Sequence, residues 1–180
     1  GSVSISSANT GSAVILTVAD GATVNYKGVT ASKFNVAPTF AGKVKFVSNL
    51  AGSATVDATV WPTALIASTL TINNSGGAAV VFTIPGSRTV GDVLDLRVGV
   101  LDLSAPATLT VANNPSTLRR RQGGSVSLGA SGVLTYTTVP DVIYEGTAAF
   151  NTGVELPATV NSLTFTRSAN AINSAVTLLS

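Results

Sequence analysis

The stretch LDLRVGVLDLSAPATLTV, residues 94–111, decides which fold this sequence favours. It contains three short segments in which apolar residues flank a polar one, at intervals of seven and eight residues: Leu94–Leu96, Leu101–Leu103 and Leu109–Val111. Alternation with a period of two predicts β-strands with one buried face. The turn residues before or between the segments are Gly91, Gly99 and Pro106. The stretch therefore predicts short strands joined by tight turns.

The composition of the whole chain agrees with this local pattern. Apolar residues make up 45% of the 180 residues, but charged residues only 10%, against about 25% in a typical soluble domain. Strong helix formers are scarce, because the chain has no Met and few Glu or Lys, whereas β-branched Val, Thr and Ile are abundant. We therefore expect an all-β fold.

Two architectures use many short strands. In a parallel β-helix, stacked coils of some twenty-odd residues bury one continuous interior. An interval of seven or eight residues suits one side of a triangular coil, so the sequence favours this solenoid-like stack. The alternative is a β-sandwich or tandem sandwiches, because the proline-containing links WPTALIAS (61–68) and ELPATVNS (155–162) resemble crossings between two sheets.

Similar phrases recur about half the chain apart. TLTINNS (69–75) matches SLTFTRS (162–168) at an offset of 93 residues, and residues 43–46 match residues 141–144 at an offset of 98. These matches predict a repeated unit of about 93 residues, with Leu70 and Leu163 as equivalent inward residues. We expect a first unit at 1–103 and a second, shorter unit at 104–180, which form one continuous structural domain.

The succession TVANNPSTLRRRQGGSVS (110–127), then VIYEGTAAFNTGVELPATVNSLTFTRSANAINSAVTL (142–178), resembles repeat units of very large exported surface proteins of bacteria, especially Bacteroidetes. Those units contain a strand with an aromatic residue and a glycine, a short G-E-L-P link and an LTI-NNS strand. The matching residues here are Tyr144, Gly146, Gly153, Glu155, Leu156, Pro157, Leu163 and Thr164. The resemblance implies an extracellular stalk, adhesin or filament segment, and it implies no catalytic residues.

The residue inventory excludes several kinds of chemistry. The chain has no His and no Cys, so serine-triad, thiol and imidazole–metal mechanisms are excluded. We therefore expect no enzymatic activity and no cofactor. Asp95 and Asp102 lie between core-facing leucines and should point to solvent. A calcium ion near these two carboxylates is a weaker alternative.

Arg119, Arg120 and Arg121 form the densest run of charge. Strict alternation after Leu118 would turn Arg120 inward, where a core cannot accept an unpaired charge. We therefore expect the three arginines at a coil corner or an exposed end. The simplest interpretation is that the three arginines are solvated at a corner. The functional alternative is that they contact an anionic glycan or another subunit.

The sequence thus favours a non-enzymatic structural segment of an extracellular bacterial surface protein, acting as a stalk, scaffold or adhesin. One alternative is a self-assembling filament subunit, completed by strands or edges of its neighbours. A second is a carbohydrate-binding β-helix. The expected partners are copies of the chain or further repeats, and polysaccharide. A net charge of +2 is too small for nucleic-acid binding, and no apolar run approaches the ~20 residues that span a bilayer.

Overall fold

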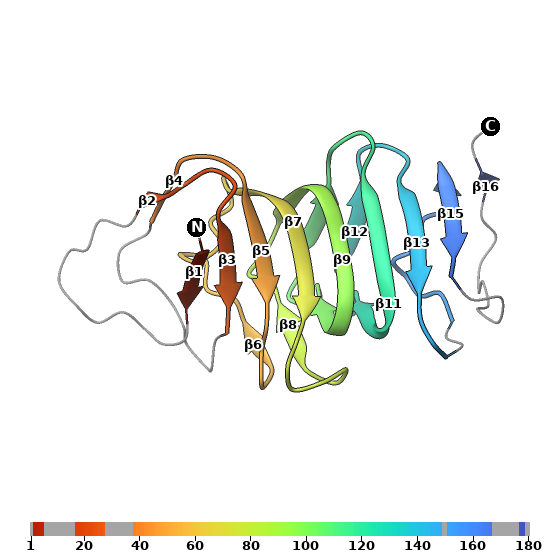
Figure 1. Ribbon diagram of the computed structural model, residues 1–180, viewed down its shortest axis with the longest axis horizontal. Helices are drawn as coiled ribbons and strands as arrows, with labels where there is room; N and C mark the ends of the chain where they lie inside the picture. The colour runs from red at the N-terminus through yellow and green to blue at the C-terminus, as the bar shows by residue number, and fades with distance from the viewer. Residues whose placement is uncertain (1, 6–16, 28–37, 149–150, 167–176, 179–180) are drawn as a thin grey trace.

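The chain is an all-β solenoid in which parallel strands stack along one axis (Figure 1). Its computed structural model describes residues 2–5, 17–27, 38–148, 151–166 and 177–178, and these form sixteen strands and no helix. Every strand pair among them is parallel. The predicted β-helix is therefore confirmed, and a sandwich of antiparallel strands is excluded.

The coil has three sides. The main sheet follows the order β1 (Ser2–Ile5), β3 (Thr23–Tyr26), β5 (Val44–Ser48), β7 (Ile66–Asn73), β9 (Arg88–Asp102), β11 (Thr117–Ser127), β13 (Asp141–Glu145), β15 (Ser162–Phe165). The second face contains β2 (Thr17–Val18), β4 (Thr39–Phe40), β10 (Thr108–Val111), β12 (Val133–Tyr136), β14 (Thr159–Val160), β16 (Thr177–Leu178) and the first residues of β7 and β9. The third face contains β6 (Ala54–Thr55), β8 (Val81–Thr83) and the last residues of β9 and β11.

Strand β9 passes through all three faces. Its first residues pair with β10, its middle with β7 and β11, and its last with β8. The segments Leu94–Leu96 and Leu101–Leu103, predicted as separate strands, therefore belong to one bent strand and its end. Gly99 lies between them with a φ of 112°, a conformation that glycine adopts without strain.

The register explains the repeat. The pairing passes from Leu70 through one residue in each successive coil to Leu163: Leu94, Leu118 and Val142. The offset of 93 residues therefore spans four coils, and Leu70 and Leu163 lie in the same inward row. Phe46 pairs with Leu70, so Phe46 is equivalent to Val142 and not to Tyr144. The expected offset of 98 residues for that match is therefore wrong, and the register gives 96.

The core is a set of such rows. The second row of the main sheet consists of Tyr26, Ser48, Ile72, Leu96, Arg120, Tyr144 and Phe165. Aromatic rings strengthen the packing: Trp61, fully buried, stacks on Phe46 with ring centroids 4.7 Å apart. Tyr26, Ile72, Leu96 and Tyr144 in this row are fully buried. Arg120 is the one charged side chain in this row.

Candidate functional site

The arginine triplet does not lie at a coil corner. It lies within β11, directly after the fully buried Leu118. Alternation therefore points Arg119 and Arg121 outward and Arg120 inward, between Leu96 and Tyr144 in the neighbouring coils. Arg120 is 9% exposed. The expectation that all three arginines are solvated was wrong because the sequence did not reveal a partner for Arg120.

That partner is Glu155, which belongs to the ELPATVNS link and is 1% exposed. The Arg120 guanidinium donates through Nη1 to Glu155 Oε1 and to the carbonyl oxygen of Asn151, and through Nε to the carbonyl oxygen of Gly124 at 2.8 Å. Glu155 Oε1 also accepts from the amide of Gly153 at 2.9 Å. A buried ion pair is tolerated when its remaining hydrogen-bonding capacity is used in this way. The pair fixes the link against β11.

Two tyrosines complete the buried cluster. The Tyr144 hydroxyl donates to Glu155 Oε1 at 3.0 Å, and the Tyr136 hydroxyl donates to the backbone oxygen of Glu155 at 2.9 Å. Burial, and next the charge of Glu155, raise the pKa of both phenols well above the usual value. Both tyrosines therefore remain protonated donors. With its carboxylate enclosed, this cluster is suited to holding the link in place.

The outward arginines form a charged patch on the main sheet. Arg119 Nε lies 3.4 Å from Glu145 Oε1, and Arg121 Nε lies 3.3 Å from Glu145 Oε2. In the preceding coil, Arg97 donates through Nε to Asp95 Oδ2 at 2.7 Å. The three arginine side chains are 37–41% exposed. Solvent and ligands can therefore reach this patch, in contrast to Arg120.

Asp95 and Asp102 have separate partners. Asp95 points out of the main sheet as expected, yet it is only 3% exposed, so the expectation of a solvated carboxylate is wrong for this residue. Asp102 lies on the third face, where it accepts hydrogen bonds from Thr83 and Ser104. These bonds lower the pKa of Asp102 against the opposing effect of burial. Among the described residues, no group of three or more acidic side chains is arranged to hold a metal ion, and calcium stays a prediction.

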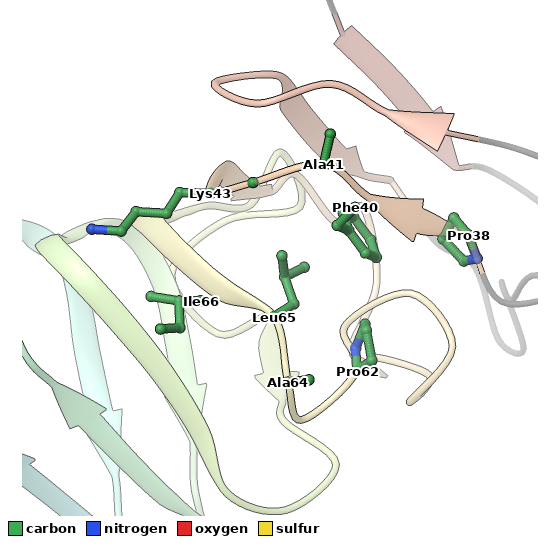
Figure 2. A pocket seen from close by; sticks show the side chains of 9 residues that line it. Pro38, Phe40, Ala41, Lys43, Pro62, Ala64, Leu65 and Ile66 are labelled. Atoms are coloured by element: carbon green, nitrogen blue, oxygen red, sulfur yellow. The ribbon is translucent and has the colours of Figure 1, made fainter.

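The second face is interrupted at each proline link. Strands β2 and β4 form one ladder, the starts of β7 and β9 with β10 and β12 form another, and β14 and β16 form a third. The first break opens a hollow of about 440 Å³ between Phe40 and the Pro62–Ile66 segment (Figure 2). The second opens one of about 450 Å³ between Tyr136 and the Glu155–Thr159 segment.

These two hollows are equivalent positions of the repeat. Phe40 precedes β5 as Tyr136 precedes β13, and Pro62 and Pro157 of the two links lie 95 residues apart, close to the four-coil offset. The first hollow is apolar: Phe40, Leu65 and Pro62 line its walls, while the Lys43 ammonium is directed away from it (Figure 2). A proline cannot donate to a strand ladder, which gives a physical reason for the break at each link.

Sequence reasoning did not identify Gln122, Thr147 or Glu145 as neighbours of the outward arginines. These residues lie beside Arg97 and Arg121 because strands one coil apart are adjacent in the main sheet. The coil length of 24 residues would have predicted this neighbourhood: Arg97, Arg121 and Glu145 follow one another at that spacing. The predicted unit of 93 residues spans four coils, so it did not reveal the spacing of a single coil.

The fold and these clusters define the chain as a parallel β-solenoid with a buried ion pair and an exposed charged patch. No protein-family model, curated protein or solved structure matches the chain. The resemblance to surface-protein repeats of Bacteroidetes stays a prediction. Within the described ranges, the chain contains no helix that is long and apolar enough to cross a membrane.

Proposed function

We propose that the chain is a non-enzymatic structural segment of an extracellular bacterial surface protein, where it acts as a stalk, scaffold or part of an adhesin. The observation that supports this proposal most directly is the inward row that passes from Val24 and Phe46 to Leu163. Each coil buries its apolar side chains against the next coil, so the stack gains length without a change of its cross-section. Such a stack is a rigid spacer.

The ion pair of Arg120 and Glu155 also suits a spacer. It closes the link between β13 and β15 onto β11, the neighbour of β13 in the main sheet. Cross-links between coils oppose local unwinding, which is the expected failure of a stacked fold under tension.

Single-molecule pulling along the solenoid axis tests this function. The chain is held between two inert handles, and its extension is recorded as the force rises. A stalk segment should keep its folded length and then unfold in one or a few cooperative steps. Gradual lengthening at low force, coil by coil from the start, would contradict the proposal.

A filament subunit is the second candidate, and one observation favours it. Leu178 in β16 pairs with Val160, which is fully buried, yet Leu178 itself is 60% exposed. An apolar residue at an inward position can be covered by the coil of a neighbouring molecule. Electron microscopy of the purified chain distinguishes the candidates: regular fibres support a filament subunit, and persistent monomers support the stalk.

A further inference from the structure

A third hollow, of about 440 Å³, lies on the charged patch of the main sheet. Its lining includes the side chains of Arg97, Arg121, Gln122, Glu145 and Thr147. The hollow is shallow and largely open to solvent. Three of its lining residues are charged, Arg97, Arg121 and Glu145, whereas each of the two hollows of the second face has one charged lining residue.

Strand irregularities place the two arginines at this hollow. The register between β9 and β11 shifts between Arg120 and Gly123, so that Arg121 and Gln122 stand opposite the single residue Arg97. The register between β7 and β9 shifts at the same corner of the preceding coil. Such β-bulges redirect side chains and are frequent beside binding sites. Here they turn two guanidinium groups from successive coils toward one space.

The charges around the hollow are not balanced. Three arginines, at positions 97, 119 and 121, face two carboxylates, Asp95 and Glu145, which leaves one positive charge in excess. Glu145 is shared by Arg119 and Arg121, and neither Nε forms a hydrogen bond in the structure, although both atoms are shielded from water. One carboxylate therefore serves two guanidinium groups, and the half-exposed side chains of Arg97 and Arg121 can offer their remaining N–H donors to an added anion.

The same set of groups distinguishes between anions. Glu145 is an acceptor with a negative charge, which repels a sulfate or phosphate group that brings no hydrogen of its own. A sugar acid brings both kinds of group: its carboxylate can accept from guanidinium groups, and its ring hydroxyls can donate to Glu145. Gln122 accepts from the amide of Ala148 through Oε1, which leaves its amide hydrogens to donate to the ligand.

We propose that this hollow binds a uronic acid residue of an acidic polysaccharide. The carboxylate lies between Arg97 and Arg121, the ring hydroxyls donate to Glu145, and Gln122 and Thr147 bind the remaining oxygens. Arg120, which is buried, takes no part. This site would give the stalk a contact with an anionic glycan, and it is independent of the stalk's mechanical role.

The test is a titration of the ¹⁵N-labelled protein with galacturonate, with glucose and with inorganic sulfate, followed by NMR. Galacturonate should shift the signals of Gln122, Gly123 and Thr147 and the side-chain Nε–H signals of Arg97 and Arg121. Glucose should shift none of them, and inorganic sulfate should bind at least about fivefold more weakly, because Glu145 repels it and receives no hydrogen bond from it. Equal or tighter binding of the sulfate would overturn the assignment to uronic acids.

Variants separate the site from general attraction of anions. Arg121→Gln should weaken galacturonate binding about tenfold, the usual effect of losing a charge-assisted hydrogen bond. Lys45→Gln removes the same charge from an exposed position on β5 and should leave binding unchanged. Arg97→Gln should act like Arg121→Gln; because Arg97 also pairs with Asp95, Arg97→Lys serves as its second variant, and the same spectra report folding. No binding by the native chain, or equal weakening by Lys45→Gln and Arg121→Gln, would sink the proposal.

Discussion

Arg120 and Glu155, separated by 35 residues in the chain, form an ion pair inside a row of otherwise uncharged side chains. Arg120 occupies a position of this row that an apolar residue such as Leu96 or Ile72 occupies in other coils. Removing one of the two charges should therefore lower the stability of the folded chain. Glu155→Gln leaves the Arg120 charge buried without a carboxylate and should lower the free energy of unfolding by about 3–5 kcal/mol.

Chemical denaturation of three variants measures this effect. The double variant Arg120→Met with Glu155→Gln removes the buried charge altogether and should recover more than half of the loss. Arg119→Gln, which removes a half-exposed partner of Glu145, is the matched control and should cost about 0–1 kcal/mol. A loss below 1 kcal/mol for Glu155→Gln would show that the pair does not hold the link.

Alkaline pH should unfold the protein through its tyrosines. Burial is the main reason why the pKa of each of the three tyrosines is raised above 10.0; the nearby charge is Asp57 for Tyr26 and Glu155 for Tyr136 and Tyr144. The folded state therefore keeps protons that the unfolded state releases above pH 10. Stability should be unaffected by the phenols below pH 10 and should then fall by about 1.4 kcal/mol per pH unit for each tyrosine.

Phenolate absorbance at 295 nm and circular dichroism, followed together, test the tyrosine prediction. The absorbance should rise only as the β-sheet signal is lost, because no tyrosine ionises readily in the folded chain. Tyr144→Phe should make the decline of stability with pH less steep. A full absorbance step near pH 10 with the β-sheet signal intact would contradict the expected burial of these hydroxyls.

Local alternation was enough to predict much of the fold. Leu94, Leu96 and Leu101 alternate with polar residues, and all three are fully buried in the solenoid. Alternation also gave the correct inward direction for Arg120. It could not supply Glu155, because the partner comes from a different coil and the link that contains it has no strand pattern. The cost of burying an unpaired charge then led to the wrong location for the whole triplet.

The charged hollow was harder to foresee for a related reason. Its arginines depend on register shifts at residues 97 and 121–122. A β-bulge adds one residue to one strand without a distinct sequence pattern, so a strict period of two assigns the side chains after it to the wrong face. Alternation after Leu96 and Arg120 turns Arg97 and Arg121 outward, but their position beside each other follows from the pairing between coils, which the sequence of a single strand does not contain.

Asn74 should be the most sensitive amide of the solenoid. It is 3% exposed; its Oδ1 accepts from Ser48 Oγ at 2.7 Å and from the Leu50 amide at 3.2 Å, and its Nδ2 donates to the Val80 oxygen at 3.0 Å. Asn74→Ala leaves buried groups of two coils unsatisfied and should cost about 2–4 kcal/mol. Asn73→Ala, at the exposed neighbouring position, should cost less than about 1 kcal/mol in the same urea titration. Equal costs would mean that Asn74 does not tie the coils together.

Gly99 is a position where both the backbone conformation and the surroundings oppose a side chain. Its φ of 112° is unfavourable for other residues, and an added Cβ would lie 2.4 Å from Asn74 Nδ2 and 2.9 Å from the Val80 oxygen. Strain of about 1–2 kcal/mol from the backbone and about 1–3 kcal/mol from overpacking should therefore add in Gly99→Ala. The added methyl group also collides with the Asn74 amide. The loss of stability caused by Gly99→Ala should therefore be smaller in a chain in which Asn74 is already replaced by Ala.

Thermal or urea unfolding tests this prediction for Gly99. The variants are Gly99→Ala, Gly52→Ala and the double variant Gly99→Ala with Asn74→Ala. Gly52 has no heavy atom within 4 Å of an added Cβ and no positive φ, so Gly52→Ala should change the free energy of unfolding by less than about 0.5 kcal/mol. Gly99→Ala should lower it by about 2–5 kcal/mol, and the double variant should lose less than the sum of its two single effects. Additive losses would locate the strain in the backbone of β9 alone, and an unchanged Gly99→Ala would show that the corner of this strand can relax around a methyl group.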